Sequence, residues 1–300
     1  MRIISLLPAA TEIVASLGSE RALVAVTHEC DWPPSVRMLP RATRSGVDGS
    51  APPNVVDDVV REASARGEAL FELDAQLICD LEPDVILTQA LCDVCAVSET
   101  DVRAIAASMS PSPDVVTLSG TAIEGVFEDI ARVASSIGVP DEGRRLVAGL
   151  RARMSMVRAR VATSERPRVA VIEWTDPLYI AGHWTPELIQ HAGGQDALAH
   201  AGQHSRRTEI EELRLADPDV LIVAPCGYDV GRAAAAGQRL LSGEAWDWAR
   251  GRQLWAVDGN GLVSRPGPRL IDGIETFAEL LHPEIFEPPH RERALELRAD

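Results

Sequence analysis

The sequence predicts an α/β protein with two lobes, each built on a parallel-type central sheet and joined by a long backbone helix. Its 300 residues, 46% hydrophobic and 25% charged, are enough for two compact lobes with separate cores. A helical pattern runs from Thr121 to Ser164, near the middle of the chain. Matching motifs lie on both sides of this stretch. These observations favour two lobes over one continuous sheet.

The central stretch contains two helical runs. Apolar residues recur at three- and four-residue spacing from Ile123 to Ile137, before Gly138-Val139-Pro140 interrupts the pattern. Asp141 then offers an N-cap for a second run that reaches Ala162 and has an apolar stripe opposite an arginine-rich side. At ~1.5 Å per residue this second helix spans roughly 35 Å, long enough to run along two small lobes. The alternative is an ordinary crossover helix within one sheet.

The N-terminal lobe, residues 1–120, begins with a strand over 2–7 and a helix over 12–17. A strand over 23–27 leads into the polar loop from His28 to Pro34, and a strand over 85–88 leads into the loop from Gln89 to Cys95. Open α/β sheets bind ligands beyond the carboxyl ends of their strands, so both loops are candidate ligand sites. The rest of the lobe is predicted to hold helices over 55–65, 74–81 and 101–107 and a strand over 115–118.

The C-terminal lobe, residues 167–286, follows the linking spine of residues 121–166 and repeats the same order. The segment Pro83-Asp84-Val85 at a strand entry is matched by Pro218-Asp219-Val220, and the helix start at Thr11-Glu12 is matched by Thr185-Pro186-Glu187. Strands are predicted over 169–173, 220–222 and 254–257. Residues 287–300 are rich in proline and then in charge, and we expect them to form a surface tail.

Charge and hydropathy exclude some partners. A net charge of -16 and a pI near 4.9 argue against nucleic acid, because a polyanion would be repelled. No apolar stretch approaches the ~20 residues of a membrane span, so membrane insertion is not expected. The apolar run between Met1 and Pro8 is too short for a signal peptide. The sequence therefore predicts a cytoplasmic location, with a periplasmic or cell-surface location as the alternative if the N-terminus has been trimmed.

The five cysteines indicate reduced thiols or a metal rather than a disulfide framework, since their number is odd. Cys92 and Cys95 form a Cys-x-x-Cys pair, whose bend directs both sulfurs to one ion. With His28 and Cys30 on the neighbouring loop they are candidate ligands for zinc or iron. The alternative is that these residues are small polarizable side chains that line a pocket.

Aromatic residues make up only 4% of the chain, yet several follow predicted strands. Flat side chains around one opening suit a large planar or apolar ligand. The predicted ligand-binding residues are Trp32, Gln89, Cys92, Trp174, His183, Trp184, Cys226, Tyr228, Asn260 and Arg265. Trp246, Trp248 and Trp255 are expected in the core, whereas the other five histidines, His191, His200, His204, His282 and His290, are expected in solvent without a partner.

Enzyme motifs are absent from the sequence. It contains no Gly-x-Ser-x-Gly elbow, no His-Glu-x-x-His and no Walker loop. Gly259-Asn260-Gly261 does not open a helix after a first strand, as a dinucleotide-binding loop would. We therefore expect no catalytic activity, and an enzyme that uses the cysteine-rich region as its site remains an alternative.

Several motifs resemble one known family. The segment Ser5-Leu6-Leu7-Pro8-Ala9-Ala10-Thr11-Glu12, the two Pro-Asp-Val strand entries and the long central helix are similar to those of class III periplasmic binding proteins, the receptors for iron siderophores and vitamin B12. Segments 28–33, 89–95, 181–187, 224–228 and 265–269 look like the cobalamin-binding branch. The resemblance covers residues 1–286 and implies a ligand between two lobes, modest closure and delivery to an ABC permease.

One surface departs from the family pattern. Members dock on the permease through one surface glutamate per lobe, a few residues before each Pro-Asp-Val. The second-lobe position is Glu211, but the first-lobe position is Gln76. A neutral amide loses a charge-assisted hydrogen bond of about 1.5–3 kcal/mol, so docking is expected to be weakened.

The resulting hypothesis is a noncatalytic protein that binds cobalamin or a related corrinoid or tetrapyrrole, for ABC-type uptake. Two alternatives stay open. One is a cytoplasmic metal- or cofactor-handling protein that uses its cysteine-rich cleft, and the other is an enzyme built on the binding-protein fold.

Overall fold

A computed structural model describes residues 1–66, 70–90 and 97–298. The chain divides into two compact units, Met1–Gly149 and Leu150–Asp300, which we call the N-terminal unit and the C-terminal unit. Each unit has its own sheet, so the predicted two-lobe α/β fold is confirmed. Among the described residues, no helix combines the length and the apolar character that crossing a bilayer requires.

The sheet of the N-terminal unit is parallel throughout, with strand order β2-β1-β5-β6. Its central strands are completely buried apart from Gln89 at the end of β5, as strands covered on both faces require. A separate antiparallel pair joins β3 to β4. The strands are β1 (Ile3–Ser5), β2 (Leu23–Ala25), β3 (Thr43–Ser45), β4 (Phe71–Leu73), β5 (Val85–Gln89) and β6 (Asp114–Leu118).

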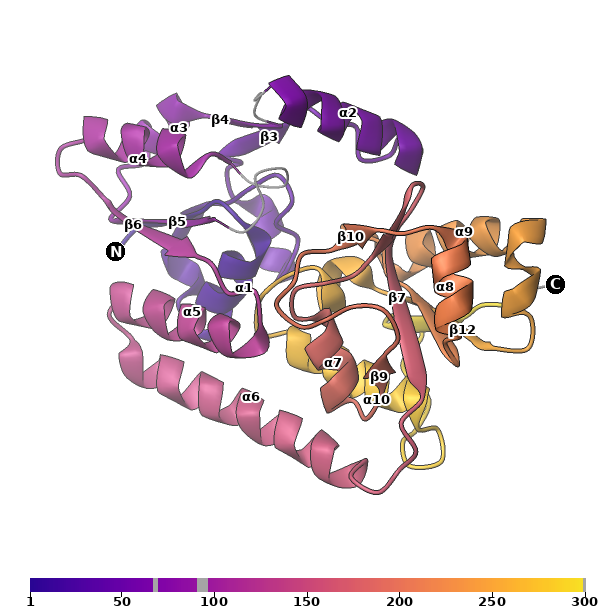
Figure 1. Cartoon of the computed structure of the whole chain (residues 1–300). Coiled ribbons are helices and arrows are strands. Elements are labelled where there is room, and N and C mark those ends of the chain that lie inside the picture. Colours follow the sequence, from indigo (N-terminus) through magenta and orange to yellow (C-terminus); the bar gives the residue numbers. More distant parts are fainter. Residues whose placement is uncertain (67–69, 91–96, 299–300) are drawn as a thin grey trace. The chain divides into compact units, whose positions relative to one another are not determined.

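Helices cover both faces of this sheet (Figure 1). The face of Ile4 and Ile86 packs on α3 and α4, and α1 and α5 contact each other on the opposite face. Asp74 and Ser98 cap the α3 and α4 N-termini by accepting backbone N–H bonds. The helices are α1 (Pro8–Ser16), α2 (Pro53–Arg66), α3 (Ala75–Asp80), α4 (Glu99–Ser108) and α5 (Ile123–Ser136), with 3-10 turns η1 (Glu20–Ala22) and η2 (Pro34–Met38).

The predicted central stretch forms two helices. After α5, residues 138 and 139 interrupt the pattern and α6 (Pro140–Arg160) follows. The boundary between the two units falls inside α6. In the C-terminal unit, α6 is fastened to α10 by Arg153, which pairs with Asp272 at 2.5 Å and Glu275 at 2.6 Å.

The sheet of the C-terminal unit has parallel central strands and antiparallel edges, in the order β10-β8-β7-β11-β12-β13. β7, β11 and β12 run parallel, and β9 pairs parallel with β7. β8, β10 and β13 add antiparallel edges that the sequence analysis did not predict. The strands are β7 (Arg168–Thr175), β8 (Leu178–Ile180), β9 (Gln195–Asp196), β10 (Arg206–Arg207), β11 (Val220–Val223), β12 (Gln253–Val257) and β13 (Ala294–Glu296).

Two layers of helices cover this second sheet (Figure 1). Ala170, Leu221 and Leu254 face α8 and α9, whereas α7 and α10 pack against each other and against the opposite face near Val169. The helices are α7 (Thr185–His191), α8 (Ile210–Ala216), α9 (Val230–Leu241) and α10 (Leu270–Leu281), with the 3-10 turn η3 (Glu244–Ala249) and the π-helical turn η4 (Gly259–Val263).

The end of the chain differs from the expected surface tail. Residues of β13 pair with β12 in register Trp255 with Glu296, and Ala294 and Leu297 are buried. Apolar residues inside a charged segment were the sequence signal for this strand. It was missed because their pairing partner lies about forty residues earlier in the chain.

Candidate functional site

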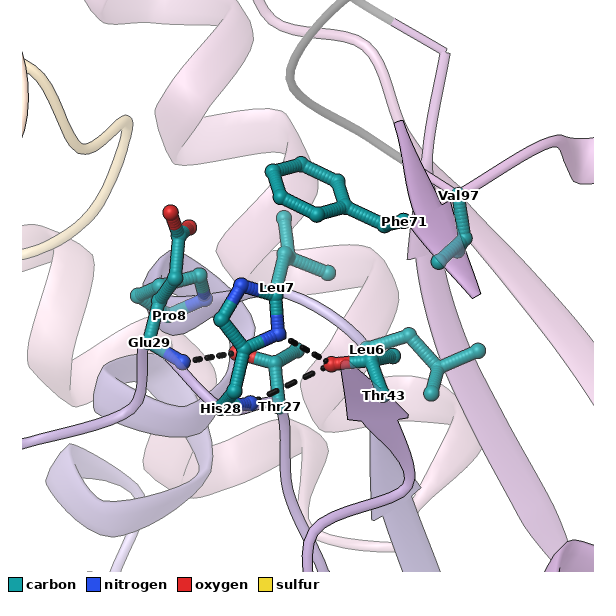
Figure 2. Close-up of a pocket in the computed structure, with 9 residues that line it drawn as sticks. All are labelled: Leu6, Leu7, Pro8, Thr27, His28, Glu29, Thr43, Phe71 and Val97. Atoms are coloured by element: carbon teal, nitrogen blue, oxygen red, sulfur yellow. Dashed lines mark hydrogen bonds between the residues drawn. The ribbon is translucent and has the colours of Figure 1, made fainter. Parts of the chain in front are cut away.

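A pocket lies beyond the carboxyl ends of β1 and β2 in the N-terminal unit. It is small and partly open to solvent. Leu6 and Leu7 come from the β1–α1 loop, Pro8 from the first turn of α1, and Thr27, His28 and Glu29 from the loop after β2. The floor and far wall are completed by Thr43, Phe71 and Val97. Figure 2 shows these nine side chains around the His28 ring.

His28 is held by its backbone and by one nitrogen of its ring. Its Nδ1 lies 2.8 Å from Thr43 Oγ1, which also accepts the His28 backbone N–H at 3.2 Å. The ring lies against Phe71, with 4.9 Å between centroids. Burial, and then the positive charge of Arg41, lower the pKa of His28. The imidazole is therefore neutral at neutral pH.

The other nitrogen of this ring faces the pocket. Nε2 of His28 is buried and has no hydrogen-bond partner among the described residues. Figure 2 shows Nδ1 turned to Thr43 and the opposite edge of the ring turned toward the space between Glu29 and Phe71. When Nδ1 carries the proton and donates it to Thr43, Nε2 presents a lone pair. Because this nitrogen is buried, the side chains around it must move before a ligand can reach its lone pair.

Cys30 is positioned differently from the expected metal ligand. Its side chain is only 1% exposed, and Sγ lies 3.1 Å from Thr11 Oγ1 and 3.3 Å from Thr27 Oγ1. Thr11 in turn donates to Ser5 Oγ at 2.8 Å. The thiol therefore belongs to a buried polar network that joins β1, α1 and the His28 loop.

The predicted metal set of His28, Cys30, Cys92 and Cys95 stays a prediction. Cys92 and Cys95 lie outside the described residues. Within the described ranges, no group of three or more His, Cys, Asp or Glu residues is arranged to hold a metal ion.

The two remaining predicted residues of this unit lie at strand and loop ends. Gln89 is the last residue of β5, and Trp32 lies in the loop before η2; both are half-buried. Arg41 shapes the loop between His28 and Trp32, because its Nη1 donates to the Thr27 carbonyl at 2.8 Å and the Cys30 carbonyl at 3.0 Å.

In the C-terminal unit, an aromatic residue near the carboxyl end of β7 meets one that follows β11. The rings of Trp174 and Tyr228 are 5.6 Å apart and edge-on. The Arg232 guanidinium lies over the other side of the Tyr228 ring, 3.9 Å from its centroid. Cys226, two residues earlier, is exposed. The predicted grouping of Trp174, Cys226 and Tyr228 around neighbouring strand ends is therefore seen within this unit.

The π-helical turn η4 organises four predicted residues. Asn260 donates its backbone N–H to the Tyr228 carbonyl at 2.9 Å, and the buried Arg265 donates to Asn260 Oδ1 at 2.8 Å. The Trp184 indole N–H donates to the Val263 carbonyl at 2.6 Å. A Cβ at Gly259 would overlap the Pro225 carbonyl, so the turn needs glycine there. Such turns are frequent at functional sites.

Burial separates these residues into two groups. Trp184, Tyr228 and Arg265 are buried, at 7%, 5% and 7% exposure, and make internal contacts. Trp174, His183 and Asn260 are half-buried and retain accessible surface. The first group therefore supports the second, a distinction that the sequence pattern did not reveal.

Three of the histidines expected in solvent are placed otherwise. His282 is 2% exposed, and His191 is half-buried with its pKa lowered by burial and by Arg158. His204 is exposed but lies with its Nδ1 3.2 Å from His183 Nε2. The expectation of solvation without a partner is wrong for these three, because burial and pairing between distant loops leave no periodic signal. His290 is exposed as expected, but it also has a partner, since its Nδ1 accepts the Glu292 backbone N–H at 3.4 Å.

The two residues of the predicted permease contact lie on exposed helical surface. Glu211 on α8 pairs with Arg214 at 2.6 Å, and hydrogen bonding to Arg214 lowers the pKa of Glu211. Gln76 on α3 donates to Asp80 Oδ1 at 2.7 Å. Both side chains are thus accessible, and both already have an intramolecular partner.

Comparison with known proteins identifies relatives of this chain. A family model described as periplasmic binding protein matches residues 3–247. The vitamin B12-binding protein of Vibrio cholerae serotype O1 is 23% identical over 93% of this chain and 88% of its own length. An uncharacterized ABC transporter substrate-binding lipoprotein of Bacillus subtilis, YvrC, is 22% identical over 95% of this chain and 81% of its own length.

A solved structure has the same fold. The periplasmic heme-binding protein from Pseudomonas aeruginosa superposes with a TM-score of 0.73 at 20% identity, covering 98% of this chain and 97% of its own. These comparisons contradict the predicted cytoplasmic location. That prediction is wrong because the similar proteins are described as periplasmic or as a lipoprotein, which points to an extracytoplasmic location.

Proposed function

The chain belongs to the periplasmic binding protein family, and from this premise we propose that it binds cobalamin or a closely related corrinoid for delivery to an ABC permease. The proposal assigns ligand contacts to the His28 pocket of the N-terminal unit and to the loops after β7, β11 and β12 of the C-terminal unit. It assigns no catalytic step to the protein.

The observation that carries the proposal is the neutral imidazole of His28. Its Nε2 has no hydrogen-bond partner in the described part of the chain, although it is buried beside Leu7, Phe71 and Val97. A buried nitrogen without a partner is costly unless a ligand completes it. A metal tetrapyrrole supplies both an electron-pair acceptor for the nitrogen and apolar faces for the surrounding side chains. The pocket is far smaller than the ~300–1,000 Å³ of typical ligand sites, so it would contact only one edge of such a ligand.

The polar groups at the sites favour a corrinoid. Corrin edges carry neutral amides, whereas haem carries two carboxylates. Glu29 lines the His28 pocket and the chain has a net charge of -16, both of which disfavour a dianionic ligand, whereas the positive charge of Arg41 beside His28 acts in the opposite direction. On the C-terminal unit, Arg265 fixes the Asn260 amide, which suits hydrogen bonding with another amide.

Aromatic surface would cover the faces of the ring. The half-buried Trp174 packs edge-on against Tyr228, whose other side is covered by Arg232. This packing gives the indole a neighbouring ring on one side. A rigid aromatic wall favours binding because less conformational entropy is lost when a ligand contacts it.

Haem is the second candidate ligand. An imidazole nitrogen such as His28 Nε2 ligates haem iron as well as cobalt, and the structurally similar Pseudomonas protein is described as heme-binding. The two ligands have different requirements, since haem needs cations near its carboxylates and a corrinoid does not. Parallel titrations with both ligands therefore separate the two candidates.

An ABC permease is the proposed protein partner. Glu211 would supply a carboxylate on the C-terminal unit, at the cost of exchanging its present Arg214 partner. Gln76 offers no charge at the corresponding position of the N-terminal unit. We infer weaker docking than in a receptor that carries both carboxylates.

The test is a titration of hydroxocobalamin into the purified protein, followed by tryptophan fluorescence and visible absorption. The proposal predicts saturable quenching of fluorescence and a shift of the visible bands when His28 replaces the cobalt-bound water. His28→Ala should abolish the band shift and weaken quenching, whereas His290→Ala, which removes an exposed imidazole, should change neither. Haemin and zinc titrated in parallel, with a Cys92→Ser/Cys95→Ser variant, report on the alternatives. Tight zinc binding that this variant abolishes, without corrinoid binding, would favour the metal-handling function.

A further inference from the structure

Two histidines of the C-terminal unit lie against each other, and one of them, His183, is a predicted ligand-binding residue. His183 Nε2 and His204 Nδ1 are 3.2 Å apart, and their rings meet edge-on with centroids separated by 5.1 Å. His183 also packs against Trp184, with 5.5 Å between ring centroids. The two imidazoles come from loops twenty-one residues apart in sequence.

The backbone fastens these two loops together. His183 N–H donates to the Gln203 carbonyl at 2.5 Å, and Gly202 N–H donates to the His183 carbonyl at 2.8 Å. Gly182 N–H adds a bond of 3.0 Å to Ser205 Oγ. A Cβ at Gly182 would overlap the Gln203 carbonyl, so this close approach requires glycine.

The backbone of His183 itself has an uncommon conformation. Its φ is +52°, in the left-handed region that residues other than glycine rarely adopt. The loop contacts maintain this backbone conformation, and the backbone conformation sets the direction of the Cα–Cβ bond of His183. The backbone contacts therefore hold the two residues side by side, with their ring nitrogens 3.2 Å apart.

We propose that His183 and His204 form a chelating site for a divalent transition-metal ion, with Nε2 of the first and Nδ1 of the second as ligands. In tetrahedral zinc sites with Zn–N bonds of 2.0–2.1 Å, two nitrogens are separated by about 3.3 Å. The observed distance of 3.2 Å between His183 Nε2 and His204 Nδ1 matches this nitrogen–nitrogen distance. On binding, the proton of the hydrogen bond between the rings would move to the other nitrogen of its own ring, so that both contacting nitrogens present lone pairs to the ion.

The chemistry of the pair defines the class of ion. Imidazole suits zinc, copper and nickel, whereas magnesium and calcium require oxygen ligands. Burial, and then His204, lower the pKa of His183, so its ring is neutral and ready to bind at neutral pH. In the described ranges no third metal-ligating side chain completes the set, so water would fill the other positions.

The proposal does not depend on corrinoid binding, and zinc alone tests it. Isothermal titration calorimetry is carried out at pH 7.5, in a background with Cys92, Cys95 and Cys226 replaced by serine so that thiolates do not contribute. We expect one site with micromolar affinity and no heat with magnesium. His204→Ala should weaken binding at least tenfold. His200→Ala, an exposed histidine on the same loop, should stay within twofold.

A second variant separates the loss of a ligand from a change in loop structure. His183→Asn removes the imidazole, yet asparagine tolerates positive φ, so the loop should keep its shape. It should lose zinc binding while its melting temperature and circular dichroism stay unchanged. In a separate titration, Cu²⁺ should quench part of the tryptophan fluorescence through Trp184, and His204→Ala should remove that component. Equal zinc affinity in all four proteins, or no binding below 1 mM (about -4.1 kcal/mol) in the parent, would refute the proposal.

Discussion

Replacing Trp184 by phenylalanine tests whether this residue supports the site or contacts ligand. Its indole N–H donates to the Val263 carbonyl at 2.6 Å, and the side chain is 7% exposed. Removing the donor leaves that carbonyl without this bond in a buried place, which costs about 1–3 kcal/mol. For a unit of this size, each kcal/mol lowers the melting temperature by about 2–4 °C. We therefore expect a loss of about 2–12 °C in thermal unfolding followed by circular dichroism.

Trp248→Phe is the matched control. The Trp248 indole nitrogen is buried and makes no hydrogen bond to any described residue, so phenylalanine removes ring volume there without breaking a bond. The melting temperature should fall clearly less than in Trp184→Phe. Hydroxocobalamin affinity of Trp184→Phe should stay within a few-fold of the parent. Equal losses of stability in the two variants, or a large selective loss of affinity, would refute the supporting role of Trp184.

Three further predictions follow from burial and charge. Iodoacetamide should label Cys226 before Cys79 and should label Cys30 last, because Cys226 is exposed and the Cys30 thiol is buried between Thr11 and Thr27. Early labelling of Cys30 would contradict this placement. Burial lowers the pKa of His28 in the folded protein. The stabilisation that the neutral His28 contributes is therefore complete above pH ~6.5 and is lost as the pH falls toward the lowered pKa. His28→Gln should make the free energy of unfolding in urea fall less steeply between pH 7.5 and 5.5, and an unchanged slope would argue against this role of His28. Arg153→Leu leaves Asp272 and Glu275 unpaired and should cost about 1 kcal/mol, whereas Arg145→Leu at an exposed pair should cost less than half of that in the same urea titration.

Local patterns were enough to predict much of the fold. The two Pro-Asp-Val segments precede β5 and β11, each a run of buried residues, and the apolar spacing of residues 123–137 became α5. These predictions succeeded because strand entry and helix amphipathicity depend on neighbouring residues. The antiparallel edges of the second sheet were missed because their pairing joins segments far apart in sequence.

The site was predicted less completely than the fold. The carboxyl ends of the predicted strands indicated where Trp174 and Tyr228 would meet, since parallel strands end at one edge of a sheet, but Trp174 lies within β7 and not in the loop after it. The π-helical turn at 259–263 has no sequence pattern of its own, and it arises from backbone contacts with the loop after β11. The pairing of His183 with His204 has the same origin. Tertiary contacts of this kind leave no trace in residue spacing.

Corrinoid binding is tested most directly by isothermal titration calorimetry of the purified chain with hydroxocobalamin, beside an identical titration with haemin. The proposed function predicts one corrinoid site with a Kd below ~100 μM, equivalent to about -5.5 kcal/mol, and weaker binding of haemin. Absence of corrinoid heat at that concentration, with saturable binding of haemin, would contradict the assignment and identify haem as the ligand.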